Sequence, residues 1–196
     1  MDKYRNKASQ KSKASNRSRK NRQETAFYYR RQKMQEALKK AKDSPLSKPE
    51  LLSILKRERD FIGIFASDQL RSLYVLKEPV FMIVNIDISS QPGSHWIALR
   101  VGKSTIEIWD SLGFNKELWS SYPDYLIKFL ERYRMSHTFY ISPILQSPNS
   151  YVCGLYCVFF ILYRPSLSFS NCVGRFSINL AKNKEKLYYL LNKKIR

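Results

Sequence analysis

The sequence predicts one α+β domain that follows a basic N-terminal extension. Short runs of β-branched and aromatic residues alternate with longer segments whose apolar residues recur at helical spacing. The 196 residues, 43% of them hydrophobic, suffice for one sizeable core. The first 42 residues carry 15 Lys and Arg against three acidic residues, so they contain little that a core could bury. We therefore expect an extension at residues 1–44 and the folded domain at residues 45–196.

The composition of the extension changes along its length. Residues 1–22 are almost entirely Lys, Arg, Ser, Asn and Gln, which predicts disorder. Residues 24–42 contain more helix formers, and we expect them to form a helix on binding a partner. The apolar residues on one side of this segment are Phe27, Met34, Leu38 and Ala41. Dense positive charge favours a nucleic-acid partner through counterion release; a solvated tail without a partner and a nuclear-import signal at 17–22 are the alternatives.

The first elements of the domain have clear boundary signals. Ser47-Lys-Pro-Glu50 has the form of a capping box and predicts a helix from Pro49 to about Arg59. A strand over residues 61–65 should follow. The run from Pro79 to Ile88 is almost continuously apolar and β-branched, which predicts a central strand buried on both faces.

A hairpin and three helices complete the predicted domain. Strands over 95–101 and 105–109 are separated by a connection short enough for an antiparallel hairpin. Pro123 opens an amphipathic helix, and residues 137–141 return as a strand. The strongly apolar segment 153–163 predicts a helix at the centre of the core. A last amphipathic helix should begin near Ser177 and use Ile178, Leu180, Leu187, Leu190 and Leu191.

The sequence argues against a secreted or membrane-spanning protein. No apolar run is long enough to cross a bilayer, and we find no secretory signal, so we expect synthesis in the cytosol. Three cysteines, an odd number, do not resemble a disulfide framework. We expect free thiols, of which one is reactive.

Cys153 stands where a loop turns into the apolar helix. Free amides and the helix dipole at such a position favour the thiolate, the nucleophilic form of cysteine. Gly154 would let a substrate carbonyl approach the backbone closely. Cys157 lies one turn further along the helix and should be buried and inert, and Cys172 should be an incidental thiol.

A thiolate nucleophile needs a base, and the chain offers His95 and His137. Either could be structural. His95 opens one strand of the predicted hairpin, and Asp110 follows the other strand, so pairing brings them to the same edge of the sheet. Asp110 could then accept from one imidazole nitrogen and leave the other to take the thiol proton. Taken alone, Asp110 would be interpreted as a turn residue before Ser-Leu-Gly.

Gln146 precedes Cys153 by seven residues in a loop. Its side-chain amide could donate to the oxyanion of a tetrahedral intermediate together with the amide of Cys153. Trp96 should be a packed wall beside His95. A zinc site built from Cys153, Cys157 and His95 would be a poor ligand pattern, so we expect no metal.

These residues resemble the active-site segment of the adenovirus protease (adenain) family. Gln146-Ser-Pro-Asn-Ser-Tyr-Val-Cys-Gly-Leu-Tyr-Cys157 shares the family's spacing from Gln to Cys, its Pro-Asn-Ser core and its Cys-Gly-Leu-aromatic-Cys ending. The resemblance extends over about residues 49–165. Its other parts are Phe61-Ile-Gly-Ile-Phe65, Ile83-Val-Asn85, Gly93-Ser-His-Trp96 and Gly113-Phe114.

The resemblance implies a papain-like active site in permuted order, with His95, Asp110 and Cys153 on a mixed β-sheet packed by helices. It implies an endopeptidase that cuts protein substrates after small-residue motifs and processes capsid or core precursors of a virus or large DNA transposon. No cofactor is then needed for the chemistry, although DNA could act as a non-covalent activator. We expect a monomer in the host nucleus or virion, or otherwise in the cytoplasm or nucleus.

Two alternatives remain open from the sequence. Trp109-Asp-Ser-Leu-Gly113 resembles the acid motif of the SUMO-deconjugating proteases of the same clan, which would make the protein an isopeptidase. Those proteases have a shorter loop from Gln to Cys and usually place Asp where Val152 stands. The other alternative is a nucleic-acid-binding protein with a silent protease fold. The region near Met135 has no cysteine, so the family's disulfide-linked activator peptide is not expected.

Overall fold

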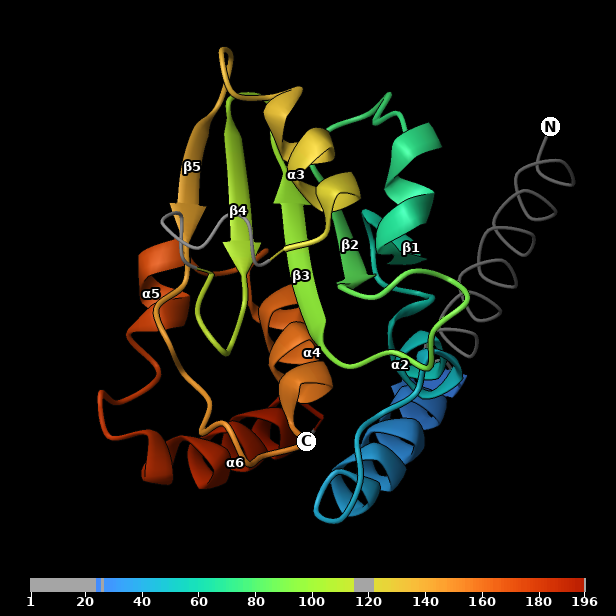
Figure 1. Cartoon of the computed structure of the whole chain (residues 1–196). Coiled ribbons are helices and arrows are strands. Elements are labelled where there is room, and N and C mark those ends of the chain that lie inside the picture. The colour runs from blue at the N-terminus through green and yellow to red at the C-terminus, as the bar shows by residue number, and fades with distance from the viewer. Residues whose placement is uncertain (1–23, 26, 115–121, 196) are drawn as a thin grey trace, which may run out of the picture.

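The computed structural model describes residues 24, 25, 27–114 and 122–195, and its centre is a mixed β-sheet (Figure 1). The strands are β1 (Phe61–Ala66), β2 (Val80–Asn85), β3 (Trp96–Val101), β4 (Thr105–Trp109) and β5 (Thr138–Ile141). They lie in the order β1-β2-β3-β4-β5. β1 is parallel to β2 and β4 is parallel to β5, while β3 is antiparallel to both of its neighbours. The predicted hairpin and the α+β fold class are confirmed.

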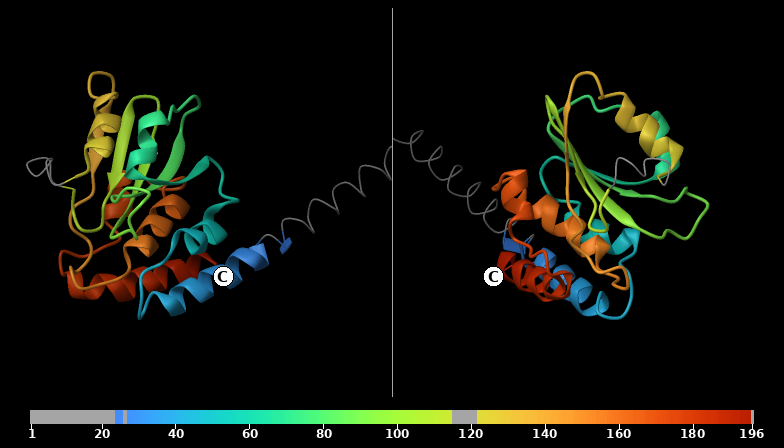
Figure 2. Two further views of the ribbon diagram at one scale, coloured as in Figure 1. Left: turned by 45° about the vertical axis from the view of Figure 1, so that its right-hand side comes forward. Right: turned by 60° about the vertical axis from the view of Figure 1, so that its left-hand side comes forward.

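Helices cover both faces of this sheet (Figure 2). They are α2 (Lys48–Leu55), α3 (Asp124–Glu131), α4 (Cys153–Tyr163), α5 (Phe169–Val173) and α6 (Asn183–Lys194), with 3-10 turns η1 (Ser67–Ser72) and η3 (Leu180–Lys182). A further helix spans residues 27–40. α3 and η1 lie on one face, and α4 with the remaining helices lies on the other. None of the helices within the described residues combines the length and apolar character that crossing a membrane requires.

β2 is buried along its whole length because both of its faces contact helices. Phe81 and Ile83 belong to the same apolar cluster as α4. The residues between and beside them belong to the cluster on the α3 side, and they are Val80, Met82 and Val84. Burial on both faces confirms the interpretation of this run, although the middle strand of the sheet is β3 rather than β2.

α4 is the centre of the larger core. Its residues from Cys153 to Leu162 are all buried, which confirms the prediction from its composition. Phe160 stacks on Trp109 of β4 at a ring-centroid distance of 4.9 Å. A Cβ on Gly154 would lie 3.2 Å from Leu51 and 3.3 Å from the Cβ of Leu46. Glycine at 154 therefore allows α4 to pack closely on α2, which gives this residue a packing role; its expected role in substrate approach stays a prediction.

The helix over residues 27–40 belongs to the core, which differs from the division expected at residue 44. Met34, Leu38 and Ala41 are buried in the cluster that contains the leucines of α6. Figure 2 shows this helix beside α6. The many charged residues of this segment made its apolar stripe hard to recognise in the sequence. That stripe is wide enough for the helix to pack against the chain's own domain rather than a partner.

Ion pairs fix the same helix to α2 and to the turn that follows it. Arg30 pairs with Glu58, and Lys40 pairs with Glu50 at 2.7 Å. Glu50 also accepts the backbone N–H of Ser47 at 2.8 Å, as the capping-box interpretation requires. The residues expected to be disordered, 1–22, lie outside the described residues.

The C-terminal helix begins later than expected. Ile178 is 99% exposed, so its predicted place on the apolar face is wrong. The Asn183 side chain accepts the backbone N–H of Ser177 at 2.7 Å and donates to the Ser177 carbonyl at 2.8 Å. This contact holds residues 177–182 as a turn, and α6 starts only after it. α5 and η1 had no separate signal in the sequence.

Candidate active site

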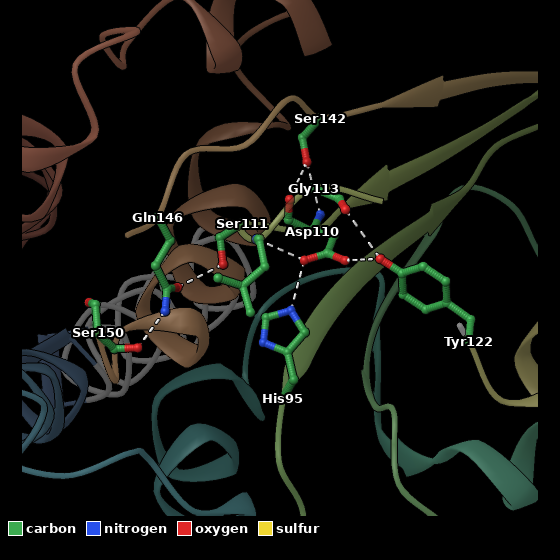
Figure 3. A network of polar contacts seen from close by, with 9 residues as sticks. His95, Asp110, Ser111, Gly113, Tyr122, Ser142, Gln146 and Ser150 are labelled. Atoms are coloured by element: carbon green, nitrogen blue, oxygen red, sulfur yellow. Dashed lines mark hydrogen bonds and ion pairs between the residues drawn. The ribbon is translucent and has the colours of Figure 1, made fainter. Parts of the chain in front are cut away.

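His95 and Asp110 meet at one edge of the sheet because of the β3-β4 pairing. His95 directly precedes β3, Asp110 directly follows β4, and Ala98 pairs with Trp109 in the antiparallel register. His95 Nε2 lies 2.7 Å from Asp110 Oδ1 (Figure 3). Both side chains are buried. The juxtaposition expected from the hairpin is therefore present in the structure.

Asp110 is held by three donors at its carboxylate. Besides His95, the backbone N–H of Leu112 donates to Oδ1 at 2.9 Å, and the Tyr122 hydroxyl donates to Oδ2 at 2.6 Å. Ser142, just after β5, bonds the backbone N–H and carbonyl of Asp110 at 2.9 and 2.8 Å. Burial raises the pKa of the Asp110 carboxyl, but hydrogen bonding to His95 and the His95 charge outweigh it, so the pKa is lowered overall.

Cys153 is the first residue of α4, and its sulfur is close enough to His95 to influence the pKa of the imidazole. Because Nε2 faces Asp110, the nitrogen available to the sulfur is Nδ1. Burial lowers the pKa of His95, but hydrogen bonds to Asp110 and Cys153 and the charges of both groups raise it from 6.5 to about 9. This environment stabilises the imidazolium. No side chain caps the N-terminus of α4. The backbone N–H groups of its first turn are therefore available close to Cys153, the first residue of the helix.

The other two cysteines are in different surroundings. Burial, with the charge of Cys153 as a smaller cause, raises the pKa of Cys157 well above its usual value. Burial likewise raises the pKa of Cys172 to about 11. All three cysteines are free, and the described residues contain no group of three or more His, Cys, Asp or Glu side chains placed to hold a metal. The thiols of Cys157 and Cys172 are therefore both buried and protonated, as expected for inert cysteines.

Gln146 lies beside these groups with its amide fixed at both ends. The Ser111 hydroxyl donates to Oε1 at 2.8 Å, and Nε2 donates to the Ser150 carbonyl at 2.5 Å (Figure 3). An amide nitrogen carries two hydrogens, so one remains for a further acceptor. The side chain is 3% exposed. A buried donor of this kind is suited to stabilise charge on an oxygen atom.

A groove of about 360 Å³ leads to Cys153. Its walls are residues 45–48, the end of β1, and residues 88, 89 and 91–94. Trp96 also lines it, and its indole Nε1 donates to the Leu46 carbonyl at 2.8 Å. The expected role of Trp96 as a packed wall is consistent with this contact, which fixes one side of the groove beside His95.

His137 lies away from this site. It precedes β5, whose first residue pairs with the first residue of β4, whereas Asp110 follows the far end of β4. Its Nδ1 is 2.8 Å from the Ser136 hydroxyl, and its ring packs edge-on against Tyr133. The structure therefore leaves His95 as the histidine near Cys153.

Sequence reasoning missed four residues that hold the site together: Ser111, Tyr122, Ser142 and Ser150. Ser111 follows Asp110 in the motif and could have been singled out by position. Ser150 belongs to the Pro-Asn-Ser core of the motif, although its contact with Gln146 could not be inferred from that. Tyr122 and Ser142 carried no signal in the sequence, because serine and tyrosine in loops usually face solvent.

The chain was compared with curated proteins, solved structures and protein families. No match was found among curated proteins. Among solved structures, the ASFV pS273R protease shares 19% identity, with a TM-score of 0.47 over 78% of this chain and 68% of that chain. The C-terminal Ulp1 protease domain, solved in complex with Smt3, the yeast ortholog of SUMO, shares 19% identity, with a TM-score of 0.31 over 59% of this chain and 54% of that chain. The sequence pattern of the adenovirus endoprotease family matches residues 61–180, which is more than half of the chain. The chain therefore belongs to the adenovirus endoprotease family and is a cysteine endopeptidase.

Proposed function

We propose that Cys153 is the nucleophile of this endopeptidase, His95 its base, Asp110 the group that orients His95, and Gln146 an oxyanion donor. The observation that carries the proposal is the contact of 2.7 Å between His95 Nε2 and Asp110 Oδ1 beside the uncapped start of α4, where Cys153 lies close enough to raise the pKa of His95. The raised pKa of His95, about 9, favours the imidazolium that pairs with a thiolate.

The reaction follows from these positions. The Cys153 thiolate attacks the scissile carbonyl, and the carbonyl π electrons move to oxygen, where the Cys153 amide and Gln146 Nε2 donate to the oxyanion. The His95 imidazolium gives its proton to the leaving amine as the C–N bond breaks. His95 then takes a proton from water, whose oxygen attacks the thioester. That proton transfer restores the imidazolium, and breakage of the C–S bond then releases the acid product and restores the thiolate.

Replacing each cysteine tests which thiol acts. Cys153→Ala should abolish peptide cleavage, because it removes the nucleophile. Cys157→Ala should leave cleavage largely intact, because that sulfur is buried and protonated. The measurement is hydrolysis of a fluorogenic Gly-Gly peptide, with circular dichroism to confirm folding. Loss of activity in the Cys157 variant alone would show that the wrong thiol had been chosen.

The substrates that we propose are capsid or core precursor proteins of a virus or DNA transposon. The family match and the Gln146-to-Cys153 segment support this class. The alternative is a SUMO conjugate, favoured by the Trp109-to-Gly113 motif. Incubation with Gly-containing precursor peptides and with SUMO conjugates distinguishes them: cleavage of the peptides supports the proposal, and cleavage of SUMO conjugates alone contradicts it.

Nucleic acid is the partner that we propose for the basic extension, with DNA as a non-covalent activator and the host nucleus or virion as the location. Residues 1–23 carry nine Lys and Arg against one acidic residue. Deleting residues 1–23 should weaken duplex DNA binding and reduce the slope of log affinity against log salt, since each phosphate contact contributes about 0.9 to that slope. Fluorescence anisotropy at several salt concentrations measures both.

The deletion should end before the helix over residues 27–40, because Met34 and Leu38 belong to the core. Peptide hydrolysis without DNA is the control and should be retained in the shortened protein. Equal DNA affinity and an equal salt slope in the shortened protein would remove the role proposed for the extension.

A further inference from the structure

The Ser111 hydroxyl has no role in the reaction described above, although it lies beside the candidate active site. Ser111 directly follows Asp110, is 1% exposed, and donates to Gln146 Oε1 at 2.8 Å. Its backbone carbonyl accepts the N–H groups of Leu145 and Gln146, both at 2.8 Å. One residue therefore binds both the backbone and the side chain of Gln146.

The partners of Gln146 determine which way its amide points. The Ser150 carbonyl is only an acceptor, so the atom that faces it at 2.5 Å must be the amide nitrogen. The oxygen then faces Ser111, whose hydroxyl supplies the matching donor. With both ends held, the second hydrogen on Nε2 has a fixed direction.

We propose that Ser111 is a positioning residue that aims the Gln146 amide at the oxyanion. The inference rests on the proposed function, because it needs Gln146 to act as an oxyanion donor. A donor stabilises the transition state only when it is already directed to where the charge develops. Without the Ser111 hydroxyl, Gln146 Oε1 is left without its donor in a buried place, and the amide can rotate.

The kinetic effect of Ser111→Ala should appear in turnover rather than in substrate binding. Removing an oxyanion donor costs about 100- to 1,000-fold in kcat. Removing the group that only aims it should cost less, about 10- to 100-fold in kcat, with KM changed less than about twofold. Hydrolysis of the fluorogenic Gly-Gly peptide by the full chain measures both constants.

Two reagents separate oxyanion positioning from general damage to the site. A peptide glycinal forms a hemithioacetal with Cys153 and places an oxygen at the oxyanion position, whereas iodoacetamide alkylates the sulfur without forming an oxyanion. Ser111→Ala should weaken binding of the aldehyde by the same factor by which it lowers kcat, about 10- to 100-fold. It should leave the rate of alkylation by iodoacetamide within about twofold of wild type. Equal losses with both reagents would overturn the inference.

A double-mutant cycle tests whether Ser111 acts through Gln146. The Ser111→Ala/Gln146→Ala protein should turn over no more slowly than Gln146→Ala alone, because the group that Ser111 aims is already absent. A further tenfold loss in the double variant would contradict the inference. If Gln146→Ala itself has no effect, the proposed oxyanion role fails instead, so the two failures are distinguishable.

Ser67→Ala is the matched control. Ser67 is 0% exposed, its hydroxyl has no hydrogen-bond partner among the described residues, and it is not one of the residues that line the groove, so this variant also removes one buried hydroxyl. Its kcat should equal that of wild type. If Ser111→Ala does not fold, Ser111→Cys keeps the size of the side chain but supplies only a weak donor, and it should show the same loss in kcat and aldehyde affinity. Wild-type kcat in a folded Ser111 variant would overturn the proposal.

Discussion

The carboxylate of Asp110 determines the electrostatics of the site because every donor around it favours the ionised form. His95, the Leu112 amide and the Tyr122 hydroxyl all donate to its two oxygens. The retained negative charge in turn favours the protonated His95. The interaction with the imidazolium stabilises the folded protein fully below pH 6.5, and this stabilisation is lost as the pH rises through about 9.

Asp110→Asn should remove that charge and lower the pKa of His95 from about 9. The alkaline decline of kcat/KM should therefore move to lower pH, and the maximum should fall on the order of 100-fold, the lower limit for positioned acid-base groups. The measurement is a pH profile of peptide hydrolysis. Glu131→Gln, which neutralises an exposed carboxylate on α3, should leave the profile unchanged. An alkaline limit that is identical in wild type and Asp110→Asn would contradict the account of His95.

Sequence reasoning could place His95 and Asp110 together because a short connection between two strands predicts that they pair antiparallel, which brings the start of one strand beside the end of the other. It could not find Tyr122, whose hydroxyl reaches Asp110 from the segment before α3. Contacts of that kind depend on the conformation of a loop, which no periodic pattern in the sequence predicts. The same holds for Asn183, which donates to the Leu145 carbonyl at 3.0 Å and so supports the Gln146 loop from α6.

At the scale of elements, the helix over residues 27–40 shows how charge can conceal a packing surface. Its outer side carries lysines and arginines, and its inner side contributes Met34, Ala37 and Leu38 to the core, joined by Ala41 directly after the helix. The average composition of the segment predicted an extension outside the domain. The burial of these few apolar residues instead makes the helix part of the domain. Strands were easier to predict, because a run such as β2 is apolar at every position.

Leu38→Ala should lower the free energy of unfolding by about 2 to 5 kcal/mol, the cost of a buried leucine truncated to alanine. Leu38 is 5% exposed in the cluster shared with α6. Urea denaturation followed by circular dichroism measures the change. Lys39→Ala, at the neighbouring exposed position, should change the unfolding free energy by no more than about 0.5 kcal/mol. Equal midpoints for both variants would mean that the helix does not pack on the domain.

At the scale of the whole molecule, the site lies where the edge of the sheet meets the start of α4. β3 and β4 supply the imidazole and the carboxylate, α4 supplies the sulfur, and the loop before it supplies the amide. Elements from both halves of the chain must dock before these four groups meet. The sequence indicates each group through its local context, but their common location depends on the packing of α4 against β3 and β4.

The most direct test of the central claim is the rate at which iodoacetamide alkylates Cys153 at pH 6.5 in wild type and in His95→Ala, with the labelled peptide identified by mass spectrometry. If the Cys153 thiolate pairs with the His95 imidazolium, wild type should react more than about tenfold faster than the variant, because the imidazolium is what stabilises the reactive form. Equal rates in the two proteins would show that His95 does not activate Cys153.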